Sequence, residues 1–197
     1  MMTIHDGRAL GLATFLILSA SVAQAAEPAS RAEAFRAADE AAGLAPAPEQ
    51  GGPGCALLPA VGEKIAGDME LAAEGHSMAF QNAATRDALV KIRHADSGRL
   101  AASFFLPGKE AMTIEGVPDG TYRVQYAFGP SLAPDCRSLT RIIKASQMPE
   151  VDDMRTHVID DDDHTEVKRS SVSYELSVTE SANVKPMAID AAAFNAE

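Results

Sequence analysis

The densest group of residues that can do chemistry lies in the last quarter of the chain. It combines carboxylates with two histidines: Asp152, Asp153, His157, Asp160 to Asp163, His164 and Glu166. Carboxylate oxygens are preferred Ca²⁺ ligands, so the run Asp160 to Asp163 could bind Ca²⁺ weakly. The candidate metal ligands are Asp160, Asp162 and His164, and a transition metal held by His157 and His164 is a further alternative. The run lacks the glycine and the alternating acids of an EF-hand loop. The other interpretation is a solvated acidic loop that stays extended because its charges repel one another.

The remaining histidines offer weak signals for acid–base chemistry. His76 precedes Ser77, and a Ser-His-Asp set can be composed from Ser77, His94 and an aspartate. The chain has no G-x-S-x-G turn, H-E-x-x-H pair, Walker loop or Rossmann glycine pattern. We therefore expect a protein that is not an enzyme and needs no cofactor beyond weakly bound Ca²⁺. A hydrolase built on such a composed site is the remaining enzymatic hypothesis.

Overall charge excludes some classes of partner. The chain has 197 residues and a formal net charge of -11. An acidic protein repels phosphate backbones and anionic lipid surfaces. We therefore expect no nucleic acid partner and no stable insertion of the mature chain into a membrane.

The amino terminus predicts export. A short polar start is followed by the apolar run Ala9 to Val22 and then by the small-x-small sequence Ala23-Gln24-Ala25. This order is typical of a secretory signal peptide, here residues 1–25, and the run is short for a membrane span. An uncleaved membrane anchor is the alternative. We expect the mature chain to be periplasmic or secreted.

Residues 26–54 have the composition of a spacer. They are rich in Ala, Pro, Gly and Glu, and Ala45 to Gly54 is typical of a linker. Ser30 and Glu33 form a capping-box pattern at the start of an Ala-rich stretch, Arg31 to Leu44, which has little apolar surface to bury as a helix. We predict a disordered or helical extension before a domain covering residues 55–197. A helix that docks a partner is the alternative for this segment.

The chain contains two cysteines, Cys55 and Cys136. In an oxidising compartment an even number predicts a disulfide, and two free thiols are the alternative. The disulfide would close a loop of about eighty residues, for which loop entropy gives roughly 4–5 kcal/mol of stabilisation.

Alternation of apolar and polar residues indicates a run of strands. We expect strands at residues 77–81, 88–95, 100–106, 111–115, 121–128, 155–159, 172–178 and 184–189, with a long loop at 129–154. The four strands between 88 and 128 each have one apolar face, which predicts an antiparallel sheet packed on one side. The later strands must supply a covering sheet. The predicted fold class is all-β, a small antiparallel β-sandwich of about seven strands.

Phe104 and Phe105 are adjacent and must point to opposite faces of their strand. If Phe104 faces the core, Phe105 lies on the other face. There it either packs under a loop or helix or contributes to an exposed apolar patch that binds a partner. Phe105 is therefore the candidate partner-binding residue.

The central strands also carry a longer pattern. It consists of Val90-Lys91-Ile92, Asp96-Ser97-Gly98, Phe104-Phe105, Gly108, Val117-Pro118-Asp119-Gly120-Thr121-Tyr122-Arg123 and Tyr126-Ala127-Phe128-Gly129. This pattern resembles small extracytoplasmic β-sandwiches of the carboxypeptidase-regulatory-like and transthyretin-like kind. It is similar above all to an uncharacterised bacterial secreted family in which Tyr174-Glu175-Leu176 and the ending Ala188 to Phe194 have counterparts. The resemblance implies a β-sandwich with an accessory role and brings no catalytic residues.

These observations favour an exported, non-enzymatic β-sandwich module that mediates protein interaction or supports cell-envelope structure. The expected partner is an unidentified envelope protein, bound by a sheet edge or by the Phe105 face. The alternatives are a calcium-responsive binding module that uses Asp160 to Asp163, and the hydrolase considered above.

Overall fold

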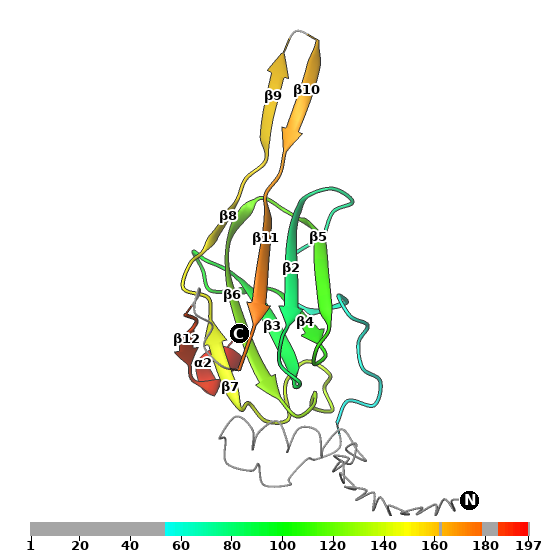
Figure 1. The fold of residues 1–197 in the computed structure, drawn as a ribbon, viewed down its shortest axis with the longest axis vertical. Coiled ribbons are helices and arrows are strands. Elements are labelled where there is room, and N and C mark those ends of the chain that lie inside the picture. The colour runs from blue at the N-terminus through cyan, green and yellow to red at the C-terminus, as the bar shows by residue number, and fades with distance from the viewer. Residues whose placement is uncertain (1–53, 162, 179–184, 197) are drawn as a thin grey trace, which may run out of the picture.

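The computed structural model describes residues 54–161, 163–178 and 185–196. Nearly all of the regular secondary structure in these residues is strand, and the one helix among them has five residues, which confirms the all-β fold class. Figure 1 shows a body made of two layers of strands, with a long hairpin projecting from one end. The predicted signal peptide, residues 1–25, lies outside the described residues, as does all but the last residue of the predicted spacer, residues 26–54.

The described chain contains twelve strands and, near its end, one short helix. In order they are β1 (Lys64–Ala66), β2 (His76–Asn82), β3 (Asp87–His94), β4 (Leu100–Leu106), β5 (Ala111–Val117), β6 (Gly120–Gly129), β7 (Lys144–Gln147), β8 (Asp152–Met154), β9 (His157–Asp161), β10 (His164–Lys168), β11 (Ser171–Leu176) and β12 (Met187–Ile189), followed by helix α2 (Ala191–Asn195). The strands expected at 77–81, 88–95, 100–106, 111–115, 121–128 and 172–178 correspond to β2 to β6 and β11.

The body consists of a large and a small sheet. The large sheet has the order β1-β4-β3-β6-β7-β12, with β8 also paired to β6, and its neighbours run antiparallel. The small sheet has the order β11-β2-β5, in which β5 is antiparallel and β11 parallel to β2. The two inner faces share one apolar core, with Val90, Val124 and Tyr126 from the large sheet and Phe80 and Ile114 from the small one.

Three details of the predicted sandwich are wrong. β5 was expected beside its sequence neighbours, but the turn after β4 takes the chain across to the small sheet, with Lys109 in the left-handed region at φ 66°. The sheets are also not wholly antiparallel, because β11 enters the body directly from the projecting hairpin and runs in the direction of β2. The segment 129–154, expected to be a loop, contributes β7 and β8, whose polar sequences lack an apolar alternation.

The large sheet is buried on both faces, not on one. A second apolar cluster on its outer face contains Leu89, Phe105, Ala127, Leu132, Leu139, Ala145 and Phe194. Lys91 and Arg93, which the alternation places on a polar outer face, are only 7% and 6% exposed. The reason is that α2 covers them.

Main-chain carbonyls at the end of α2 hold these two cations. Lys91 Nζ donates to the Phe194 carbonyl at 2.9 Å, and Arg93 Nη2 donates to the same oxygen at 3.1 Å. Carbonyls at the carboxyl end of a helix have no partner within it and carry partial negative charge, so they suit buried cations. The other end of α2 is capped by Asp190, which accepts from the Ala193 N–H at 2.6 Å. A helix of five residues is thereby fixed on the sheet.

We expect Phe194→Ala to lower the free energy of unfolding by about 3–5 kcal/mol, because it removes a fully buried ring from the second cluster. Asn195→Ala, at the exposed neighbouring position, is the matched control and should change that free energy by less than about 0.5 kcal/mol. Urea unfolding followed by circular dichroism measures both. Equal effects of the two substitutions would show that α2 does not pack as described.

Candidate functional site

The strands β9 and β10 form a two-stranded hairpin that extends away from the body (Figure 1). All ten of its strand residues are exposed. Three of them are aliphatic: Val158 is 58% exposed, Ile159 40% and Val167 44%. An isolated two-stranded hairpin is at best marginally stable in water. Its order therefore depends on how its base is attached to the body.

A fully buried histidine, His76 at the start of β2, makes that attachment. Its Nδ1 accepts a hydrogen bond from the Ser170 N–H at 2.8 Å, so in the neutral ring Nε2 carries the proton and donates to Asp119 Oδ1 at 3.0 Å. Asp119 also accepts from the Thr156 hydroxyl at 2.7 Å and from the Thr156 N–H at 3.1 Å. Thr156 precedes β9 and Ser170 follows β10, so this network holds both strands of the hairpin where they leave the body.

The network also fixes the charge of its carboxylate. Hydrogen bonds from the Thr156 hydroxyl and N–H, and then from His76, lower the pKa of Asp119 to about 2. Donors that favour the ionised form of a carboxyl group lower its pKa in this way. Asp119 therefore stays negatively charged at neutral and mildly acidic pH.

Further contacts below the hairpin tie β8 to β11 and β11 to β2. The Tyr174 hydroxyl donates to the Asp152 carboxylate, and burial raises the pKa of both groups. The Tyr174 ring stacks on Phe80 with 5.2 Å between centroids. Ser77 Oγ donates to Ser171 Oγ at 2.8 Å. The segment on which the hairpin stands is therefore bonded to both sheets of the body.

The structure does not assemble the serine, histidine and aspartate considered for a hydrolase. Ser77 belongs to the small sheet and donates to Ser171. His94 belongs to the large sheet, where its Nε2 lies 3.0 Å from Asp68 Oδ1, and Arg99 pairs with the other oxygen of Asp68 at 2.5 Å. The two side chains are therefore held in different layers by different partners.

Two of the three candidate metal ligands, Asp160 and His164, lie on the hairpin and do not converge. Asp160 pairs with Thr165, whereas His164 pairs with Asp161, and cross-strand partners share a face. Asp160 and His164 consequently point to opposite faces. Asp162, the third candidate ligand, lies outside the described residues. The residues that the structure describes contain no group of three side chains able to hold a metal ion.

Phe105, the candidate partner-binding residue, is fully buried, so the exposed apolar patch predicted for it is wrong. Its ring packs in the second cluster beneath α2 and the segment after β6. The alternative that Phe105 packs under a loop or helix is the one the structure shows. The sequence contained no plain signal for this cover, because Ala191 to Asn195 is short and mostly alanine.

Cys55 and Cys136 form the expected disulfide, with 5.0 Å between their Cα atoms. The bond joins the segment before β1 to the loop after β6. Beside it the Cys55 N–H donates to the Leu132 carbonyl at 3.1 Å. The disulfide therefore links the first described residues to the loop that packs on the outer face of the large sheet.

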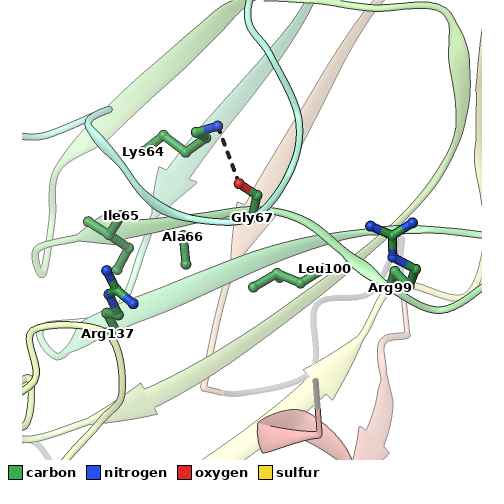
Figure 2. Close-up of a pocket in the computed structure, with 7 residues that line it drawn as sticks. All are labelled: Lys64, Ile65, Ala66, Gly67, Arg99, Leu100 and Arg137. Carbon is green, nitrogen blue, oxygen red and sulfur yellow. Dashed lines mark hydrogen bonds between the residues drawn. The ribbon is translucent and has the colours of Figure 1, made fainter.

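A groove of about 580 Å³ beside β1 is lined by Lys64, Ile65, Ala66, Gly67, Arg99, Leu100 and Arg137. Figure 2 shows Arg99 and Arg137 at its opposite ends and Lys64 directed toward Gly67. Arg99 is paired with Asp68, and Lys64 Nζ donates to the Gly67 carbonyl at 3.4 Å. Because two of its three cations already have partners, the groove is a weaker candidate than the hairpin.

Comparison with protein-family models, curated proteins and solved structures found no match. The resemblance to a secreted β-sandwich family stays a prediction from the residues. Across residues 54–161, 163–178 and 185–196, no helix is long and apolar enough to span a membrane.

We expect the stability difference between the native protein and Asp119→Asn to shrink as the pH falls. A carboxyl group with a lowered folded pKa stabilises the protein above its unfolded value, near 4, and this stabilisation is lost toward the folded pKa of about 2. Urea unfolding between about pH 7 and about pH 2 measures the difference. Glu175→Gln removes an exposed carboxylate outside the network and should give a small, constant difference. A constant difference for Asp119→Asn would contradict the described network.

Proposed function

We propose that this chain is an exported, non-enzymatic β-sandwich module that mediates protein interaction in the cell envelope, and that the β9–β10 hairpin is its binding element. The observation that carries the proposal is the contrast between the hairpin and its base. The hairpin exposes the aliphatic side chains of Val158, Ile159 and Val167. At its base, the fully buried His76 and the carboxylate hydrogen-bonded to it hold both strands in place. Such an attachment keeps an otherwise marginal hairpin ordered while its apolar side chains stay exposed, as a binding element requires.

The hairpin offers the two features that protein partners use on strands. Its outer edges carry main-chain donors and acceptors, and its aliphatic side chains provide apolar contact area. Its acidic residues, Asp160, Asp161, Asp163 and Glu166, disfavour anionic lipid and nucleic acid surfaces. A protein surface is therefore the partner that fits this element.

The hydrogen bonds of the His76 ring support a role without catalysis. One ring nitrogen accepts from a main-chain N–H and the other donates to Asp119, so neither is available to take a proton from a nucleophile. The disulfide supports export, because such bonds persist in oxidising compartments.

We expect a photo-crosslinking amino acid placed at Val158 to form covalent adducts with a protein in living cells. The same amino acid at Thr113, exposed on the edge strand β5, is the control and should give no adduct, because only the hairpin is proposed to bind. Adducts are detected by a shift in electrophoretic mobility and identified by mass spectrometry. Adducts at Thr113 but not at Val158 would refute the hairpin as the binding element.

A further inference from the structure

We infer that His76 makes the hairpin a pH-dependent element: protonation of the ring in mild acid breaks its bond to Ser170 and loosens the β10 end of the hairpin, while the two sheets stay folded. The inference rests on the proposed function for its consequence alone, namely that binding by the hairpin weakens in acid. The observations that carry it are the burial of the ring, the directions of its two hydrogen bonds and the charge of Asp119.

The bond to Ser170 exists only while the ring of His76 is neutral. The main-chain N–H of Ser170 can only donate, so Nδ1 of the ring, 2.8 Å away, must be the nitrogen without a proton. An imidazolium ring carries a proton on both nitrogens and offers no acceptor. Turning the ring over would not help, because either nitrogen would present an N–H. Protonation therefore sets two donors against each other, and the Ser170 N–H must move away from the ring.

Asp119 allows the ring to be charged inside the folded protein. Its Oδ1 lies 3.0 Å from Nε2 of His76, which donates in both states of the ring. Hydrogen bonds from Thr156 and then from His76 lower the pKa of Asp119 to about 2, so the carboxylate is ionised in mild acid. A buried charge is tolerated when it is paired. Mild acid therefore changes the Ser170 side of the network and leaves the Thr156 side bonded.

The small sheet is held by contacts that do not involve the ring. The Ser77 N–H donates to the Ser170 carbonyl at 3.1 Å, and the pairing of β11 with β2 begins at the next residue. Arg169 pairs with Glu74 at 2.9 Å. β11 consequently stays in its sheet when the Ser170 N–H is released. The hairpin is more sensitive, because all ten of its strand residues are exposed and its order depends on the attachment at its base.

The other charged or titratable side chains at the base of the hairpin belong to types that do not respond to mild acid. They come from the segments that meet there: Glu74, Asp119, Tyr122, Arg155 and Arg169. Among side-chain types, imidazole is the one that ordinarily changes charge between about pH 7 and about pH 5. His157 and His164 on the hairpin are imidazoles too, so they have to be separated from His76 by substitution.

Nuclear magnetic resonance of the isotopically labelled protein between about pH 7.5 and about pH 5 tests the inference. The ring nitrogens of His76 report its protonation, and amide hydrogen exchange reports local order. We expect protection of the Ser170 amide, corrected for intrinsic exchange, to fall about tenfold with the same midpoint as His76 protonation. Amides of the buried Val90 and Val124 should keep their protection. A ring that protonates without a change at Ser170 would overturn the inference, as would a ring that stays neutral until the body unfolds.

Substitution of the histidines assigns the response. His157→Gln combined with His164→Gln removes two exposed imidazoles, so the protein should fold normally and Ser170 should still lose protection in acid. His76→Gln keeps one donor and one acceptor but does not titrate, so the protection of Ser170 should no longer depend on pH. A response that disappears in the double variant would overturn the inference. The native titration and the double variant decide this even if His76→Gln fails to fold.

The consequence for binding is measured separately. With the double variant as background, adducts from the photo-crosslinking amino acid at Val158 should fall about tenfold in cell extracts adjusted from about pH 7.5 to about pH 5. Equal amounts of adduct at both pH values would overturn the inference and leave the proposed function standing. Loss of protection at Ser170 without adducts at either pH would support the response to acid and refute the proposed function.

Discussion

The structure depends on the burial of both faces of its central strands. On β3, β4 and β6, Val90 and Phe104 face the small sheet, while Leu89 and Phe105 face the carboxyl-terminal helix. A sheet covered on both sides excludes water from its main-chain hydrogen bonds, and close packing makes such a body resist deformation. The carboxyl-terminal segment and the disulfide-linked loop therefore act as structural parts of the domain, although they contribute only one short helix and a few apolar side chains.

The hairpin is stabilised in a different way. It buries none of its strand residues, so apolar packing cannot hold it. Polar contacts at its base replace packing, and they are effective because His76 is removed from water while each of its ring nitrogens has a partner. The molecule thus combines a body held by apolar contacts with an arm held by a small hydrogen-bond network. Changes to that network should affect the arm before the body.

Sequence patterns identified the strands whose side chains alternate and missed the features that depend on tertiary contact. Val124 and Tyr126 were placed on an inner face because alternation reports directly on burial. The same alternation predicted that Lys91 and Arg93 are exposed to solvent. It was wrong because the carbonyls that accept their hydrogen bonds belong to residues about a hundred positions away. Among the candidate site residues, the cysteine pair was identified, but Phe105 was assigned to a partner surface that α2 occupies. His76 carried no local signal, because its two partners, Asp119 and Ser170, are distant from it in the sequence.

An exposed hairpin with aliphatic side chains and a free edge carries a risk of uncontrolled strand addition. The carboxylates of Asp160, Asp161 and Asp163 near the tip limit this risk, because they repel the same residues of another copy that approaches tip to tip. The hairpin can therefore expose its edges and its aliphatic side chains without inviting unlimited strand addition.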